Sequence, residues 1–206
     1  MENEKRAVIC DVGGVLWPLI DMNLWEEALF LDSRWPTRDE FETAKKIAYR
    51  VALEPFERGE KTAGEFQILF QGILGLEHLD AATFWRLYME ILGEINMPLL
   101  ECVRSMQEHG IILALLSNID EERLKYMMAN RRDEYTKMAN FFHYHFFSCR
   151  IGSRKPEPTV YRHVFETLSV MPTNMYYLDD HQPNISGMAA AIPAMPPENM
   201  HLYRID

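Results

Sequence analysis

The sequence of 206 residues lacks any long uninterrupted apolar run. A membrane-spanning helix needs about 20 such residues, so we expect no membrane partner. Basic residues are also scarce, because 21 lysines and arginines stand against 31 aspartates and glutamates and leave a formal net charge of −10. Nucleic acids and anionic lipid surfaces attract the opposite balance, so we expect no nucleic-acid partner either.

Cysteine is rare as well. The three cysteines, Cys10, Cys102 and Cys149, are odd in number and lack the spacing of a metal site. We therefore expect reduced thiols and a cytoplasmic location. The chain has no internal repeat, and its 48% hydrophobic and 25% charged residues are typical of a globular protein. Its length predicts one domain with a modest insertion, and no feature of the sequence sets an oligomeric state.

The spacing of apolar residues then divides the chain into two parts. Residues 7–10 form a short apolar run that ends at Asp11 and predicts a buried strand. Residues 20–96 carry four amphipathic helical patterns without a strand signal, which predicts an all-helical bundle. Four residues are expected to cap these helices: Asn23, Thr37, Thr62 and Asp80.

After Pro98, helices and strands alternate, which predicts right-handed crossovers and a parallel sheet. The predicted strands are 111–116, 146–147 and 175–178, with a weaker signal for an edge strand at 201–205. Ligands bind at the carboxyl ends of strands in such sheets. Three predicted strands end in polar residues that would meet at that edge: Asp11, Ser117 with Asn118, and Asp179 with Asp180.

The residues at this edge fit a metal site. Asp11 is followed by Gly13 and Gly14, which let the backbone approach a ligand closely. Asp179 and Asp180 add two carboxylates, and crowded carboxylates repel one another unless a cation lies between them. Mg²⁺ prefers one or two carboxylates, water and a phosphate oxygen, so Mg²⁺ is the expected cofactor.

Neutral and positive groups complete the set. Ser117 and Asn118 would supply neutral donors, and Lys155 lies on a turn stiffened by Pro156 and Pro158. A carboxylate nucleophile, a metal, a hydroxyl and a lysine indicate phosphoryl transfer through an aspartyl-phosphate.

Four segments resemble, in order, the four motifs of the haloacid dehalogenase (HAD) superfamily: 7–16, 113–118, 154–158 with Tyr161, and 176–180 followed by Asn184 and Gly187. Residues 56–60 with Glu65 and Phe66 also resemble the helical cap of one branch. That branch contains bacterial alpha-D-glucose-1-phosphate phosphatase and the phosphatase domain of soluble epoxide hydrolase. The resemblance implies an α/β fold, with a Rossmann-like parallel core at 1–18 and 97–206 and an inserted cap at 19–96.

The resemblance also implies a role for each residue. Asp11 would be the nucleophile and a metal ligand, together with the Gly13 carbonyl and Asp180, and Asp179 would bind the metal or lie next to its ligands. Ser117, Asn118 and Lys155 would hold the transferring phosphoryl group. The implied activity is Mg²⁺-dependent hydrolysis of a small phosphorylated metabolite, with a sugar phosphate as the expected substrate.

Gly13 departs from the family pattern, which usually has a second aspartate there as general acid and base. Two alternatives therefore stay open: a non-catalytic or weakly active HAD-like binding or regulatory protein, and a 2-haloacid dehalogenase. His181 follows the acidic pair and is expected to be a loop residue. His143 and His145 have no third ligand at useful spacing in the sequence, so we expect no metal there.

Overall fold

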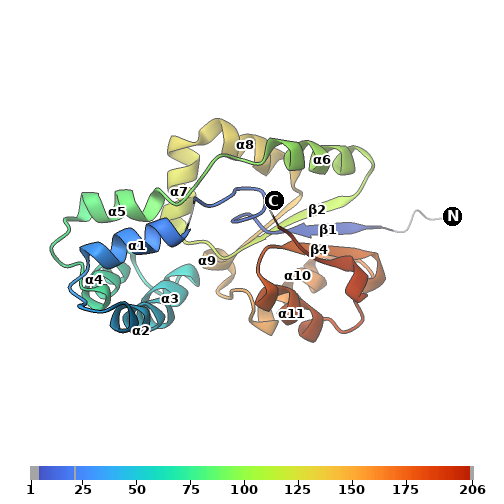
Figure 1. Cartoon of the computed structure of the whole chain (residues 1–206). Coiled ribbons are helices and arrows are strands. Elements are labelled where there is room, and N and C mark those ends of the chain that lie inside the picture. The colour runs from blue at the N-terminus through green and yellow to red at the C-terminus, as the bar shows by residue number, and fades with distance from the viewer. Residues whose placement is uncertain (1–4, 21, 205–206) are drawn as a thin grey trace.

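A parallel sheet forms the centre of the larger part of the molecule (Figure 1). In the computed structural model, which describes residues 5–20 and 22–204, five parallel strands pair in the order β3-β2-β1-β4-β5. Their bounds are Ala7–Cys10 (β1), Ile112–Ser117 (β2), Tyr144–Phe147 (β3), Met175–Asp179 (β4) and Met200–Leu202 (β5). The predicted parallel α/β fold is thus confirmed.

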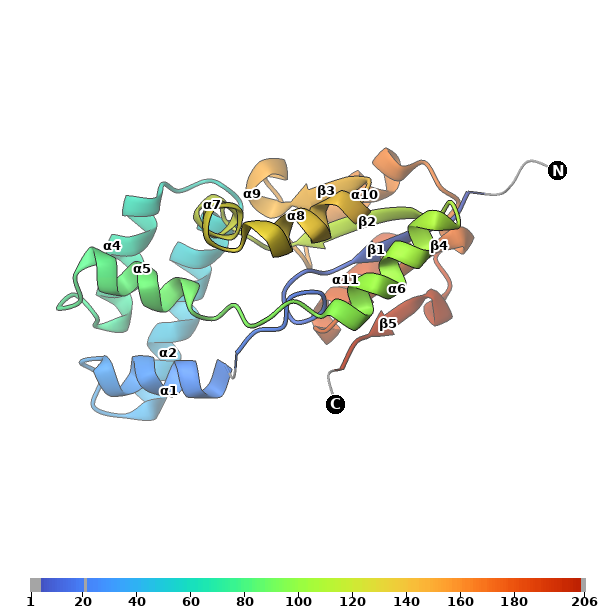
Figure 2. The same ribbon diagram turned by 90° about the horizontal axis from the view of Figure 1, so that it is seen from above.

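Helices cover both faces of this sheet (Figures 1 and 2). One face carries α6 (Met97–Glu108), α7 (Glu121–Asn130) and α8 (Arg132–Phe141), and the other carries α10 (Pro158–Leu168) and α11 (Gln182–Ala191). Successive side chains of a strand point to opposite faces. Cys10 of β1 therefore packs into the first of these cores, whereas Ala7 and Ile9 pack into the second.

Two helices of this part were not predicted, α8 and the short α9 (Ser148–Ile151). Neither has a side chain bonded to its first turn as an N-cap. That signal marks the start of the predicted helices, so its absence explains why sequence patterns missed these two.

The remaining helices form a cap at one end of the molecule (Figure 2). They are α1 (Met22–Asp32), α2 (Arg38–Ala48), a π-helical turn (Tyr49–Leu53), α3 (Glu54–Glu57), α4 (Ala63–Leu74) and α5 (Ala81–Met89). Thr37, Thr62 and Asp80 cap their helices as predicted, whereas Asn23 lies inside α1. Aromatic rings fill the interior, where the fully buried Phe66 ring stacks 4.3 Å from that of Phe56.

Two segments, 18–20 and 91–93, join the cap to the sheet side by side. The Gly93 amide donates to the Pro18 carbonyl at 2.9 Å, and a Cβ at Gly93 would lie 2.9 Å from that oxygen. Only glycine therefore permits this approach. We propose that the crossing separates a core at 1–18 and 97–206 from a cap at 19–96.

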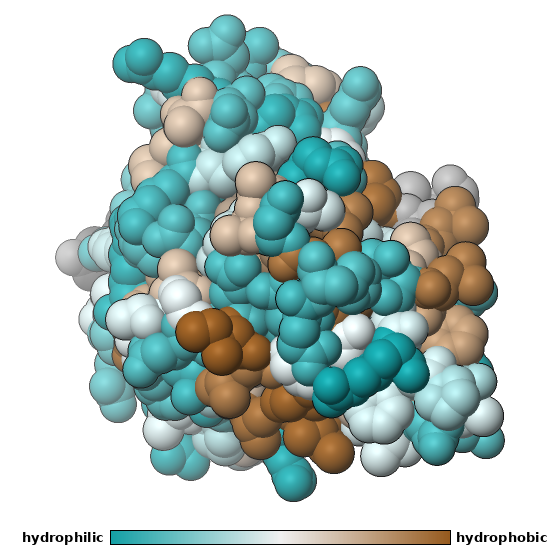
Figure 3. Space-filling view, turned by 90° about the vertical axis from the view of Figure 1, so that its left-hand side faces the viewer, coloured by the Kyte–Doolittle hydropathy of each residue, from teal (hydrophilic) through white to brown (hydrophobic). Residues whose placement is uncertain are grey.

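The surface at the cap end is mixed, with hydrophobic areas among hydrophilic ones (Figure 3). Exposed apolar side chains of the cap include Leu24, Leu31 and Ile68. Among the described residues, none of the helices has the length and apolar character that crossing a membrane would require.

Candidate active site

The carboxyl ends of the three central strands bring the predicted residues together. Asp11 follows β1, Ser117 ends β2 and Asp179 ends β4, and β1 pairs with both of its neighbours. One carboxylate oxygen from each of Asp11, Asp179 and Asp180 lies within 4.8 Å of the others. These side chains, apart from Asp179, line a cavity of about 270 Å³ that also contains Gly13, Asn118 and Lys155.

Lys155 joins two of these acids. Its side chain is 1% exposed, and its Nζ lies 2.7 Å from Asp11 Oδ1 and 2.7 Å from Asp179 Oδ2. Burial alone would lower the pKa of Lys155, but the two carboxylates raise it overall. The lysine therefore stays charged beside the carboxylate that the sequence marks as nucleophile.

Asn118 holds the loop that carries this lysine. Its Nδ2 donates to the Lys155 carbonyl at 2.9 Å, and its Oδ1 accepts from the Lys155 amide at 2.8 Å. Both ends of the Asn118 side chain are thus used to position Lys155. Ser117 differs, because its buried hydroxyl lines the cavity and makes no hydrogen bond within residues 5–20 and 22–204.

Asp179 is surrounded by donors. Its Oδ2 accepts from Lys155 Nζ, from the Tyr177 hydroxyl at 2.5 Å and from Asn184 Nδ2 at 3.1 Å. Its Oδ1 accepts from the His181 amide at 2.8 Å and from Asn184 at 2.9 Å. Burial alone would raise the pKa of Asp179, but Lys155 and the other donors lower it. Asp179 is therefore an anion whose oxygens are already engaged.

Asp11 and Asp180 are in the opposite electrostatic state. Burial raises the pKa of Asp11 to about 7, and Asp179 and Asp180 raise it further while Lys155 lowers it. Burial and the neighbouring Asp179 also raise the pKa of Asp180. Both carboxylates therefore lack enough positive charge, which is the condition that a divalent cation would relieve.

The two glycines after Asp11 have different surroundings. Gly14 has a φ of +76°, and a Cβ there would lie 1.9 Å from Asp180 Oδ2. Gly14 is thus needed for the Asp180 carboxylate to lie over the loop. Gly13 has no positive φ, and the nearest atom to a Cβ there is Leu19 Cδ2 at 3.9 Å. A side chain would fit at Gly13.

The three histidines singled out in the sequence have different positions. His143 Nδ1 accepts from the Leu113 amide at 3.0 Å, and His145 Nε2 lies 3.1 Å from the Ala139 carbonyl, so both serve the sheet edge. His181 is exposed and lines the cavity.

A comparison with protein families decides the relationship of this chain. The family model described as a haloacid dehalogenase-like hydrolase matches residues 5–191. The chain belongs to the HAD-like hydrolase family.

Individual relatives are distant. Bifunctional epoxide hydrolase 2 from Rattus norvegicus is 28% identical over 93 residues, which is 44% of this chain but only 16% of that protein. A HAD family enzyme from Bacteroides thetaiotaomicron, solved as a magnesium complex, is 19% identical and superposes with a TM-score of 0.76 over 98% of this chain and 94% of that one. Its complex with magnesium and inorganic phosphate gives a TM-score of 0.72 at 19% identity, over 97% and 94% of the two chains. These structures support the HAD-like fold.

Sequence motifs missed two charged residues that line the cavity of this HAD-like hydrolase. Glu57 comes from α3 in the cap, and Arg123 comes from the first turn of α7. No motif or strand end marks either residue. Glu57 did lie within the cap segment that resembles the family, but periodicity does not show which cap residues face the site.

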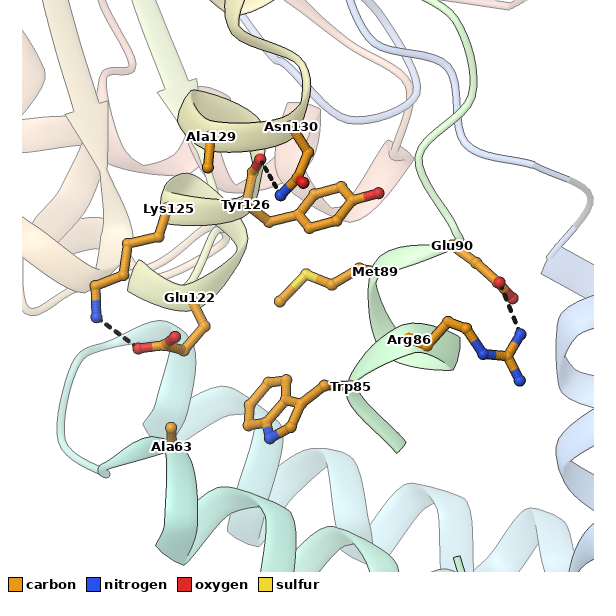
Figure 4. A pocket seen from close by; sticks show the side chains of 10 residues that line it. All are labelled: Ala63, Trp85, Arg86, Met89, Glu90, Glu122, Lys125, Tyr126, Ala129 and Asn130. Carbon is orange, nitrogen blue, oxygen red and sulfur yellow. Dashed lines mark hydrogen bonds and ion pairs between the residues drawn. The ribbon is translucent and has the colours of Figure 1, made fainter. Parts of the chain in front are cut away.

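A larger hollow of about 590 Å³ lies between α5 and α7 (Figure 4). Trp85, Met89 and Tyr126 point into it, and Lys125 and Glu122 pair at its edge. None of the three clustered aspartates of the described residues lines it. The smaller cavity therefore holds the chemistry of this hydrolase.

Proposed function

We propose that this HAD-like hydrolase is a Mg²⁺-dependent phosphatase that acts on a small phosphorylated metabolite, a sugar phosphate above all, through an aspartyl-phosphate at Asp11. The observation that carries the proposal is the Asp11 carboxylate, which shares one cavity with the Lys155 ammonium, a free hydroxyl at Ser117 and the Asp180 carboxylate. The family match supports hydrolysis, and the phosphate-bound relative supports a phosphorylated ligand.

The donor set suits a magnesium ion. Asp11 and Asp180 are under-neutralised carboxylates in one cluster, and the Gly13 carbonyl follows Asp11 on the same loop. We assign the metal to these three residues, because hard oxygen donors are what Mg²⁺ requires. Asp179 fits a different role, since its oxygens already accept from Lys155, Tyr177 and Asn184. A bound Mg²⁺ would supply positive charge at the phosphoryl oxygens.

The protein residues divide the chemistry between them. In the first step an Asp11 oxygen forms a bond to phosphorus while the bond from phosphorus to the leaving oxygen breaks. Lys155 and Ser117 hold the negative oxygens of the transferring group, and Asn118 positions Lys155. Water then attacks the aspartyl-phosphate, which frees inorganic phosphate and restores the Asp11 carboxylate.

Gly13 leaves the proton of the leaving alkoxide without a donor at the usual position. A positioned acid–base group contributes typically 10²–10⁴-fold, so hydrolysis of alkyl phosphates should be slow and should depend steeply on the pKa of the leaving group. Anomeric sugar 1-phosphates and aryl phosphates would be favoured because their leaving groups need less proton assistance.

One experiment separates the proposal from its two alternatives. Phosphate release is measured from a panel of sugar, alkyl and aryl phosphates, with Mg²⁺ and with excess chelator, and halide release is measured from 2-haloacids. Phosphate release that needs Mg²⁺ supports the proposal. Halide release without metal would establish the dehalogenase, and binding without turnover would establish the regulatory alternative.

A further inference from the structure

The cavity has two chemically different ends. Its floor holds Asp11, Ser117 and Lys155, which we assign to the phosphoryl group. Its remaining walls hold Glu57 and Arg123 among apolar side chains, of which Leu19, Leu92 and Met127 are examples. A phosphate ester bound at the floor would direct its leaving group toward these walls. At about 270 Å³ the space suits a metabolite of modest size.

Arg123 has no carboxylate partner among residues 5–20 and 22–204. Its guanidinium carbon lies 4.2 Å from the centre of the Tyr88 ring, and Nη2 donates to the Tyr88 carbonyl at 3.3 Å. The buried Nε makes no hydrogen bond at all. Leaving a buried donor unpaired is costly, so a ligand group that accepts from this guanidinium would be favoured.

The nearest acid that could have paired with Arg123 is used elsewhere. Asp120 accepts from the Tyr88 hydroxyl at 2.7 Å and from the Arg123 amide at 2.8 Å. The Tyr88 ring and Asp120 thus fix the guanidinium in place at the junction of α5 and α7 without neutralising it. A rigid donor is what specific recognition requires.

Glu57 supplies the complementary group. It is 7% exposed, and its Oε2 accepts from Arg154 Nε at 2.9 Å. Its Oε1 makes no hydrogen bond within the described residues. The cavity wall therefore presents one donor that needs an acceptor and one acceptor that needs a donor.

We infer that Arg123 and Glu57 form a hydroxyl-binding pair that selects phosphate esters with a polyhydroxylated leaving group. A hydroxyl can accept from Arg123 and donate to Glu57, and the apolar walls suit the C–H faces of such a molecule. A carboxylate or second phosphate on the leaving group would meet the Glu57 charge. The inference rests on the proposed function, because the phosphoryl end sets the direction of the ligand.

The test compares two substrates that differ only in ring hydroxyls, myo-inositol 1-phosphate and cyclohexyl phosphate. Arg123→Met should lower kcat/KM for the hydroxylated substrate about tenfold to a hundredfold more than for the other. Glu57→Gln should shift the same ratio in the same direction. Thermal unfolding of each variant checks that the fold is kept.

Two control variants match these changes. Lys125→Met removes a cation from the same helix, at the outer hollow, and should leave the ratio unchanged. Glu54→Gln removes another carboxylate that pairs with Arg154, whose Nη1 lies 3.6 Å from Glu54 Oε1, so it reports effects transmitted through Arg154 alone.

Three results would overturn the inference. Equal losses on both substrates would show that Arg123 only supports the fold, and an effect of Glu54→Gln equal to that of Glu57→Gln would place the Glu57 effect on Arg154. A loss confined to phosphoglycolate would show that Arg123 binds a carboxylate. If the wild-type protein released no phosphate even from p-nitrophenyl phosphate, the proposed function itself would fail, a result distinct from the other three.

Discussion

The sheet edge and the interior of the cap are both buried, yet they are built from opposite kinds of side chain. Asp11, Lys155 and Asp179 are charged and at most 6% exposed at the sheet edge, whereas the cap interior is a cluster of rings around Phe66. Burying apolar rings stabilises a fold, and crowding carboxylates away from water destabilises it. The first region is therefore expected to serve chemistry at a cost in stability, and the second to provide stability.

Charge reaches the cap only where it meets the core. Glu57 pairs with Arg154, and Arg58 Nη1 lies 3.0 Å from Glu157 Oε1, so α3 is joined to the loop that carries Lys155. The cap thus contributes a stable wall and a small number of polar groups, while the reacting groups come from the core. Four predictions test this division, from the largest expected effect to the smallest.

The largest effect is expected for Asp11→Asn, which removes the nucleophilic charge but keeps the shape. Phosphatase activity should fall about 10³-fold or more. The melting temperature should stay the same or rise, because one member of a crowded carboxylate cluster is gone. Activity assays and calorimetry on the same preparation check this, and a large fall in Tm with retained activity would invert the assignment of the two regions.

Phe66→Ala should show the reverse behaviour in the cap. Removing a fully buried ring should cost about 3–5 kcal/mol of the free energy of unfolding, with a lower Tm. At a temperature where the variant is folded, kcat should change far less than in Asp11→Asn. Denaturant unfolding and kinetics measure the two quantities. Ile68→Ala on the exposed face of the same helix is the control and should leave stability nearly unchanged.

Gly13→Asp sharpens the comparison within the site itself. There is room for a side chain at Gly13, so the variant can place a carboxyl where the proton donor is missing. Hydrolysis of alkyl phosphates should rise, by up to about 10²-fold, and that of aryl phosphates should rise less. Gly14→Ala should instead lower activity, because its Cβ would displace Asp180. A uniform loss in Gly13→Asp across all leaving groups would contradict this account.

The smallest effect is a pH-dependent stabilisation by Mg²⁺. The pKa of Asp11 is raised to about 7 in the fold, so without metal its contribution to stability is present at low pH and is lost as the pH rises through 7. Mg²⁺ binds the deprotonated carboxylate, so its removal should lower Tm more at pH 8 than at pH 5.5. Thermal unfolding with Mg²⁺ and with chelator checks the sign, and Asp180→Ala should abolish the difference.

The sequence by itself determined the sheet edge. Asp11, Ser117 and Asp179 could be identified because parallel strands share the direction in which they end, so the residues that end them meet without any knowledge of packing. The cap could be recognised for a similar reason, since helical periodicity and the caps at Thr37, Thr62 and Asp80 are local signals.

Only the tertiary structure decided how these groups act on one another. It placed Lys155 between two carboxylates, engaged Asp179 with five donor contacts, left space at Gly13 and brought Glu57 of the cap to the same cavity as Arg123 of the core. Periodicity shows which face of a helix is buried but not which side chains of two packed elements meet. That depends on how the cap lies against the sheet, which is set by contacts between residues far apart in the chain.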